Sequence, residues 1–243
     1  MIKAILLDLD DTLLRTNMST FLPMYFQALG RHMQAFLSAD ELIPLILQST
    51  AKMMEDSDPE KTNQDVFDSH FFPGLNHDPE EVKTAIRQFY EDEFPKLRQY
   101  TNPMPFAVEL VDLLVNHGFK LVVATNPLFP RRAIEHRIHW AGLSQVAFDW
   151  ITTYENSHFC KPNPLYYREI LSRLGVQPRE AVMIGDDYEK DIIPAKQLEM
   201  MTFWVSGQDA KKQPHGDLKD CILWLQSTII AGSGSGDEKD LPV

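Results

Sequence analysis

The stretch IKAILLDLDDTLL, residues 2–14, is an apolar run that leads into the aspartates Asp8, Asp10 and Asp11. A run this apolar predicts a strand over residues 2–9 that is covered on both faces, as in a parallel sheet. Because side chains alternate along a strand, Asp8 and Asp10 should face the same side while the chain stays extended. Two carboxylates that close repel each other unless a cation or a shared proton compensates them. The alternative is that Asp10 and Asp11 only cap a turn.

Further short apolar runs predict more strands, because they are too short for helices and rich in β-branched or aromatic residues. They cover residues 119–124, 150–152, 181–184 and 202–205. Helical spacing and end signals predict helices between them, over residues 105–117, 130–140 and 164–174. Strands that alternate with helices imply right-handed crossovers and a parallel sheet. The predicted fold class is α/β, with a three-layer Rossmann-like core.

The segment between residues 15 and 104 is different, because no strand-like run is found in it. It contains a capping box that starts at Ser38 and another helix start at Asp78. Phe21, Tyr25 and Leu29 recur at helical spacing. We therefore predict a second, small all-helical domain inserted after the first strand. The alternative is a set of ordinary helices packed on the sheet.

The predicted domains follow from this division. Residues 1–14 and 105–231 form the α/β core, and residues 15–104 form the helical insertion. Residues 232–243 begin with Gly-Ser-Gly-Ser-Gly and end in an acidic stretch, which predicts a flexible tail.

The composition excludes several classes of protein. The chain has 243 residues and a formal net charge of −12, and its 14 Phe and 4 Trp argue against disorder over most of its length. An acidic chain without a basic block is a poor match to nucleic acid and to anionic membrane surfaces. No apolar run reaches the ~18 residues that a membrane span needs. Cys160 and Cys221 make no disulfide framework, so we expect a reducing, cytoplasmic location.

A second acidic cluster, Gly185-Asp186-Asp187-Tyr188-Glu189-Lys190-Asp191, directly follows the predicted strand 181–184. Alone it could be an N-cap with an acidic first helical turn. However, the carboxyl ends of parallel strands lie at one edge of the sheet, where ligands bind in open α/β folds. The two acidic clusters should therefore meet at this edge. Oxygen ligands of this kind suit Mg²⁺, which keeps water and substrate phosphate as its remaining ligands.

Two more polar sites are predicted at the same edge. Thr125 and Asn126 end the predicted strand 119–124, and their hydroxyl and amide groups could hold phosphate oxygens. The alternative is a simple turn before Pro127. Lys161 follows the predicted strand 150–152. A lone lysine is usually a surface residue, but this one lies in a strand-to-helix loop of the same edge.

Taken in order, these sites read Asp-x-Asp-x-Thr, Thr-Asn, Lys-Pro and Gly-Asp-Asp-x-x-x-Asp, each after a predicted strand. This order resembles the four signature motifs of the haloacid dehalogenase (HAD) superfamily. The first motif, LLDLDDTL at residues 6–13, is specific, whereas Thr-Asn and Lys-Pro would mean little alone. The resemblance covers residues 1–14 and about 105–230. The segment between them stands where this superfamily carries a helical C1-type cap.

The resemblance implies roles for individual residues. Asp8 would be the nucleophile that forms an aspartyl-phosphate, and Asp10 the general acid and base. Thr125 and Asn126 would bind the phosphate, and Lys161 would neutralise the nucleophile and the transferring phosphoryl group.

The resemblance also implies a magnesium site. Asp8, the backbone carbonyl of Asp10 and Asp186 would be the protein ligands of Mg²⁺. Asp187, Asp191 and Thr12 would lie behind these ligands or act through water. The two aspartates would hold metal-bound waters or orient Lys161.

Asp10 helps to choose among the reactions of this superfamily. A dehalogenase needs no acid to protonate a halide and typically lacks this second aspartate. The pair Asp8 and Asp10 therefore favours a phosphatase that acts on a small phosphorylated metabolite. A sugar-phosphate mutase, a dehalogenase and a catalytically silent domain that binds a phosphorylated ligand stay open, as do a monomer and a homodimer.

The substrate cannot be read from the sequence. Phe21, Tyr25 and Phe71 of the predicted cap could touch it or could be core residues. Arg131 or Arg132 could contact it or could belong to a solvated helix start.

Overall fold

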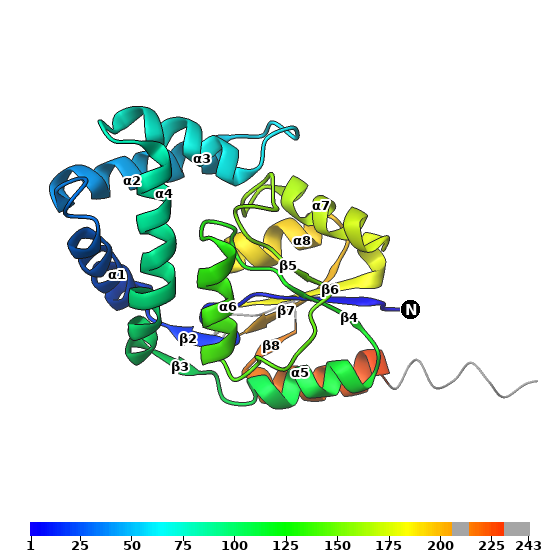
Figure 1. Cartoon of the computed structure of the whole chain (residues 1–243). Coiled ribbons are helices and arrows are strands. Elements are labelled where there is room, and N and C mark those ends of the chain that lie inside the picture. Colours follow the sequence, from blue (N-terminus) through cyan, green and yellow to red (C-terminus); the bar gives the residue numbers. More distant parts are fainter. Residues whose placement is uncertain (206–213, 231–243) are drawn as a thin grey trace, which may run out of the picture.

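The computed structural model describes residues 1–205 and 214–230 of the chain. Its centre is a parallel sheet with the strand order β5-β4-β1-β6-β7-β8 (Figure 1). The strands are β1 (Ala4–Leu7), β4 (Lys120–Val123), β5 (Trp150–Ile151), β6 (Ala181–Gly185), β7 (Met201–Val205) and β8 (His215–Gly216). The predicted parallel sheet and its five predicted strands are confirmed. The sequence analysis missed β8, because His215 and Gly216 form no apolar run.

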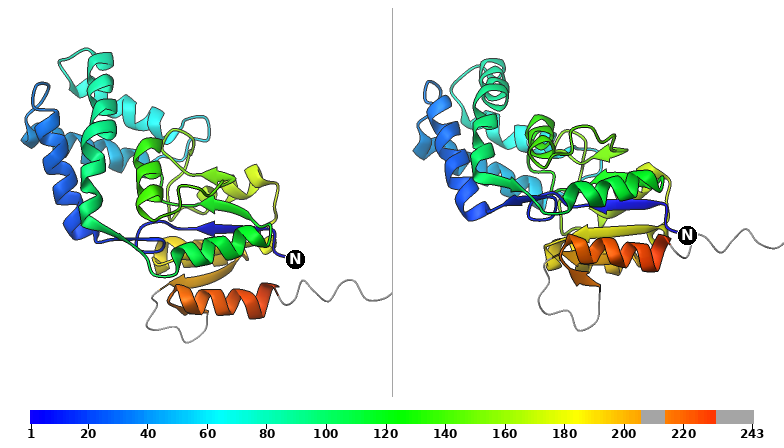
Figure 2. Two further views of the ribbon diagram at one scale, coloured as in Figure 1. Left: turned by 60° about the horizontal axis from the view of Figure 1, so that its bottom comes forward. Right: turned by 90° about the horizontal axis from the view of Figure 1, so that it is seen from below.

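Helices cover both faces of this sheet (Figure 2). Ile5 and Leu7 of β1 pack with one set of helices, and Ala4 and Leu6 pack with the other. The first set is α5 (Ala107–Asn116), α6 (Arg131–Trp140) and α9 (Leu218–Leu225), and the second is α7 (Pro164–Leu174) and α8 (Ile193–Gln197). Because alternate residues of β1 both enter apolar layers, the strand is apolar at every position. The predicted three-layer α/β arrangement is confirmed.

Helices fill most of the segment between β1 and α5. They are α1 (Met18–His32), α2 (Ala39–Glu55), α3 (Asn63–Phe71) and α4 (Pro79–Gln88), together with the short helices η1 (Phe72–Gly74), η2 (Phe89–Glu93) and η3 (Phe94–Tyr100). Residues 17–100 are called the helical segment below. The predicted helix starts are confirmed, since Ser38 caps α2 in a capping box and Asp78 caps α4. Figure 1 shows these helices beside the edge of the sheet at which β1 ends.

The prediction that residues 15–104 contain no strand is wrong at both ends of the segment. β2 (Leu14–Thr16) pairs with the antiparallel strand β3 (Thr101–Pro103). Strands of three residues carry too little alternation to be recognised in a sequence. The chain therefore enters and leaves the helical segment through one paired ribbon. The predicted tail, residues 232–243, and residue 231 lie outside the described residues.

The helical segment also binds the α/β part of the chain away from this ribbon. At the start of α3, the backbone N–H groups of Asn63 and Gln64 donate to the carbonyls of Ser157 and Tyr154, each at 2.8 Å. The ring of Phe94 stacks on Trp140 of α6 with centroids 5.4 Å apart. The helical segment thus lies against α6 and the loop after β5. No helix of the described residues is both long and apolar enough to cross a membrane.

Candidate active site

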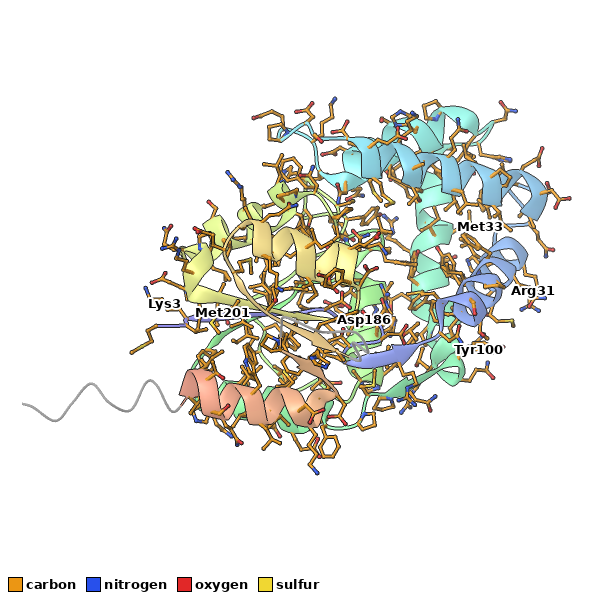
Figure 3. The ribbon with its side chains drawn as sticks, turned by 180° about the vertical axis from the view of Figure 1, so that it is seen from behind. Lys3, Arg31, Met33, Tyr100, Asp186 and Met201 are labelled. Carbon is orange, nitrogen blue, oxygen red and sulfur yellow. The ribbon has the colours of Figure 1, made fainter. Side chains whose placement is uncertain are left out.

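Three aspartates meet at the carboxyl edge of the sheet. Asp8 follows β1 and Asp186 follows β6, and these strands are neighbours paired in register. Asp8, Asp186 and Asp191 each offer a carboxylate oxygen, and these oxygens lie within 4.8 Å of one another. Figure 3 shows Asp186 on the side of the sheet that faces the helical segment, away from Lys3 and Met201. The two acidic clusters therefore converge as predicted from the strand order.

Lys161 joins two of these carboxylates. Its Nζ donates to Asp8 Oδ1 at 2.8 Å and to Asp191 Oδ1 at 2.6 Å, and only 2% of its side chain is exposed. Burial alone would lower the pKa of this lysine, but Asp191 and Asp8 raise it well above its ordinary value. Asp191 and Asp8 therefore favour the positively charged form of Lys161 inside the acidic cluster.

Asp186 has a weaker set of partners. Its carboxylate accepts a long hydrogen bond of 3.4 Å from the Thr12 hydroxyl. Burial, followed by the charges of Asp8 and Asp191, raises the pKa of Asp186 to about 8. The cluster thus places three carboxylates around one ammonium group. A hard divalent cation fits such a site, because every side-chain donor is a carboxylate oxygen and the negative charge exceeds the positive charge.

A glycine allows Asp191 to reach this position. A Cβ atom on Gly185 would overlap the Asp191 carboxylate. The second oxygen of Asp191 accepts a hydrogen bond from the Asp187 N–H at 3.1 Å. Asp187 itself accepts from the backbone N–H groups of Glu189 and Lys190, each at 3.0 Å. The sequence predicted that these two aspartates hold metal-bound waters or orient Lys161. Asp191 binds Lys161 directly, and Asp187 caps its own helical turn.

Asp10 is not part of the three-aspartate cluster. Its Oδ2 accepts a hydrogen bond of 2.6 Å from Nη1 of Arg137, a residue of α6 whose side chain is 1% exposed. Burial raises the pKa of Asp10 above its ordinary value, although the charge of Arg137 acts in the opposite direction. β1 ends at Leu7, and the turn begins at Asp11. Asp8 and Asp10 bind two different side-chain cations, Lys161 and Arg137.

The turn after β1 uses a third aspartate. Asp11 has a left-handed backbone with φ of 57°, and its Oδ1 accepts from the Thr16 N–H at 2.8 Å. The turn role that the sequence left open for Asp10 and Asp11 therefore describes Asp11.

The sequence analysis missed Arg137. The sequence contained a signal that this residue is buried, because Arg137 lies between Ile134 and Ile138 on the apolar side of its helix. A charged residue in such a stripe is buried only with a partner. The sequence does not tell which carboxylate that partner is.

The loop after β4 is tied to the loop that carries Lys161. The Asn126 side-chain oxygen accepts from the Lys161 backbone N–H at 3.1 Å. The carbonyl of Thr125 accepts from the Thr152 hydroxyl at 2.7 Å and from the Tyr166 hydroxyl at 2.8 Å. These bonds hold the loops after β4 and β5 together at the same edge of the sheet.

A cavity of about 610 Å³ lies between the helical segment and the loops after β4 and β5. Tyr25 and Phe71 line it, whereas Phe21 is fully buried and outside its lining. Arg131 and Arg132 also line it, and both form ion pairs, with Glu135 at 2.8 Å and with Glu91 at 2.7 Å.

The model of the haloacid dehalogenase-like hydrolase family matches residues 2–199. The chain belongs to this family. It is therefore a HAD-like enzyme of the hydrolase type, as its motifs and its fold class indicated. The four motif positions Asp8, Thr125, Lys161 and Asp186 all lie within the matched residues.

Relatives of this HAD-like hydrolase have several activities. It is 30% identical over 211 residues to a glyceraldehyde 3-phosphate phosphatase of Methanocaldococcus jannaschii, which covers 83% of this chain and 84% of the relative. It is 26% identical over 205 residues to the pyrophosphatase PpaX of Bacillus velezensis, at coverages of 84% and 83%. In fold it resembles a 2-haloacid dehalogenase from Pseudomonas syringae, with a TM-score of 0.64, 23% identity and coverages of 93% and 99%.

Proposed function

We propose that this HAD-like hydrolase is a Mg²⁺-dependent phosphatase that cleaves a small-molecule phosphate monoester through an aspartyl-phosphate on Asp8. The observation that carries the proposal is the buried Lys161 ammonium group, which bridges Asp8 and Asp191 beside Asp186. The phosphatase names of relatives over more than four fifths of the chain support it. The presence of Asp10 favours a phosphatase over a dehalogenase.

In the first step, an Asp8 carboxylate oxygen attacks phosphorus while the bond to the leaving oxygen breaks. Both reactants are negative, and Lys161 reduces their repulsion because it lies 2.8 Å from Asp8. Asp10 gives its proton to the leaving oxygen, so that an alcohol departs. A positioned acid of this kind typically contributes about 10²–10⁴-fold to the rate.

In the second step, water attacks the phosphorus of the aspartyl-phosphate. Asp10, now a carboxylate, accepts a proton from this water, and Asp8 leaves as a carboxylate with release of inorganic phosphate. Thr125 and Asn126 follow β4 at the same edge and would hold the phosphate oxygens. Asn126 also fixes the loop of Lys161, so that the lysine is oriented before substrate binds.

Mg²⁺ would be held by Asp8, Asp186 and the backbone carbonyl of Asp10. When bound there, the cation would supply positive charge that stabilises the phosphoryl oxygens. Asp191 lies within the same oxygen cluster, but its oxygens bind Lys161 and the Asp187 N–H. We therefore assign it the orientation of Lys161. Thr12 would orient Asp186 through its hydroxyl.

We further propose that residues 15–104 form a cap domain on a core of residues 1–14 and 105–231. The β2–β3 ribbon is the covalent link between the two parts, and η2, η3 and α3 contact α6 and the loop after β5. A cap at this place excludes water from the carboxylates and selects the leaving group.

A trapping experiment tests this proposal. Protein treated with EDTA and then supplied with Mg²⁺ is screened against phosphorylated metabolites, with released phosphate as the readout, and is quenched in acid during turnover. We expect phosphate release only with the metal, and phosphorylation of the peptide that contains Asp8. The control protein is Asp112→Asn, which changes an exposed aspartate and leaves Asp8 in place. Turnover without metal, or phosphorylation of another residue, would contradict the mechanism, and transfer to a second sugar hydroxyl would indicate a mutase.

A further inference from the structure

We propose that the ester cleaved by this enzyme carries a large apolar group, which lies in the cavity between the helical segment and the loops after β4 and β5. This inference rests on the proposed phosphatase function and names its substrate class. The cavity has a volume of about 610 Å³, within the range of sites that enclose drug-sized ligands.

The walls of this cavity are apolar on several sides. All four helices α1–α4 contribute aliphatic or aromatic side chains, among them Leu22, Phe26, Ile46, Phe67, Phe71 and Ile86. Tyr25 and Tyr90 also line it, but their hydroxyl groups bind each other at 2.9 Å. Both hydroxyl groups therefore have a partner. Thr50, Gln64 and Asp68 also line the cavity, but most of its lining residues are apolar.

The cations that line this cavity already have partners. Arg131 pairs with Glu135 and Arg132 with Glu91, while Lys83 pairs with Glu80 at 3.0 Å. Arg87 donates to the Thr84 hydroxyl at 2.9 Å. Lys83, Arg131 and Arg132 thus have carboxylate partners, whereas the partner of Arg87 is a neutral hydroxyl. With three of its four cations paired, the lining favours an uncharged group over an anionic one.

One aromatic ring connects the cavity with the proposed general acid. Phe129 lines the cavity and lies in the loop that begins with Thr125 and Asn126. The Arg137 guanidinium lies over this ring, 4.6 Å from its centroid, and holds Asp10. Asp10 itself does not line the cavity, but Phe129 and Arg137 connect the cavity wall with this residue, which gives its proton to the leaving group. This position assigns the cavity to the leaving group of the ester.

A series of n-alkyl monophosphates from ethyl to decyl phosphate tests this inference in the presence of Mg²⁺. Each buried methylene is worth about 0.8 kcal/mol, which is roughly a fourfold change in kcat/KM. We expect kcat/KM to rise by two- to fourfold per carbon over part of the series. Ile46→Gln should reduce this dependence, and Gln48→Glu, an exposed residue of the same helix outside the cavity lining, should retain it.

The possible outcomes distinguish a failure of this inference from a failure of the proposed function. Turnover of glycerol phosphate together with a flat or falling alkyl series would overturn the inference and leave the phosphatase in place. The absence of phosphate release from every ester would overturn both. Because the wild-type series is informative alone, a folding defect in Ile46→Gln, checked by circular dichroism, does not decide the result.

A different observation carries a second inference about the same reaction. Arg137 Nη2 and Asp10 Oδ1 are buried and have no hydrogen-bond partner among the described residues, although Nη1 and Oδ2 bind each other. Buried polar atoms are normally satisfied, so an open pair of this kind indicates that a ligand completes it. We infer that Arg137 is a positioning residue. It holds one oxygen of Asp10 and leaves Oδ1 available to the leaving oxygen of the ester.

The leaving-group dependence of the rate tests this role. An alkoxide needs a proton to depart, whereas 4-nitrophenolate departs without one. We expect Arg137→Met to lower kcat about 10²-fold or more for an alkyl phosphate, and less than tenfold for 4-nitrophenyl phosphate, with KM little changed. Arg137→Lys should recover part of the alkyl rate. Equal losses for both esters in soluble, folded variants would show a structural role and overturn this second inference.

Discussion

The three-aspartate cluster and the apolar cavity lie near the same edge of the sheet but differ in construction. The cluster is formed by buried charges on the loops after β1 and β6, with Lys161 from the loop after β5. The cavity is formed mainly by apolar side chains of α1–α4. In the cluster, the energy of each buried charge depends on the charges beside it. An apolar residue of the cavity wall contributes to stability mainly through its own buried surface. Substitutions should therefore have large, coupled effects in the cluster and small, separate effects around the cavity.

The largest effect is expected for Asp8→Asn. The amide keeps the shape of the side chain but cannot act as the nucleophile, so phosphate release should fall by on the order of 10⁴-fold or more. Released phosphate measured under substrate saturation checks this, with Asp112→Asn as the control. Activity that survives in Asp8→Asn would remove this residue from the reaction and the cluster from its place as the active site.

Lys161→Met should come next. It leaves Asp8 and Asp191 buried without their cation, and breaking such a pair costs about 3–5 kcal/mol in the free energy of unfolding. We expect a lower urea midpoint and a loss of phosphate release. Lys190→Met is the matched control, because Lys190 pairs with Asp187 at an exposed position. Similar losses in the two variants would argue against a distinction between buried and exposed pairs.

The pH dependence of stability tests whether the cluster holds more negative than positive charge. Since the folded-state pKa of Asp186 is raised to about 8, the folded protein binds more protons than the unfolded chain between the ordinary aspartate pKa and about 8. The stability contributed by the protonated carboxyl is therefore lost as the pH rises through this window. In EDTA, the melting temperature should fall between pH 5 and 8, and less so in Asp186→Asn.

Mg²⁺ should oppose this trend, because it binds the ionised carboxylates and stabilises the folded state only. The gain in melting temperature on adding Mg²⁺ should be greater at pH 8 than at pH 6. A gain that is independent of pH, or equal in Asp186→Asn, would place the metal elsewhere.

Substitutions of two glycines distinguish the effect of packing at the cluster from the effect of backbone strain. In Gly185→Ala the new Cβ meets the Asp191 carboxylate, which should cost about 1–3 kcal/mol and lower activity. Gly118 has φ of 71° and open space around its Cβ position. Gly118→Ala should therefore cost about 1–2 kcal/mol through backbone strain and leave activity unchanged. Thermal melts and phosphate release distinguish the two, and an active Gly185→Ala would show that Asp191 can shift without consequence.

The smallest effect is expected in the cavity wall. Tyr25→Phe removes one hydroxyl of the Tyr25–Tyr90 hydrogen bond and keeps the ring. The expected loss in the free energy of unfolding is about 0.5–1.5 kcal/mol. Denaturant unfolding measures it, and a loss comparable with that of Lys161→Met would contradict the contrast between the two regions.

Much of the fold could be predicted from local patterns. The buried strands show unbroken apolar runs, and α2, α4 and α7 begin at capping residues that act through their own neighbours in the chain. The convergence of Asp8, Asp186 and Lys161 also followed from the sequence, because parallel strands bring their carboxyl ends to one edge. The strands β2, β3 and β8 were missed, since their short sequences Leu-Arg-Thr, Thr-Asn-Pro and His-Gly form no apolar run.

The sequence by itself determined the α/β class, the order of the motifs and the sheet edge at which their side chains gather. Only the tertiary structure decided that Asp10 binds Arg137, 127 positions away, while Asp8 binds Lys161. It also decided that Asp191 rather than Asp187 reaches the lysine, and that α1–α4 enclose a cavity. The physical reason is that strand and helix periods are local properties of the chain. The partner of a buried charge and the shape of a cavity depend instead on how distant helices pack.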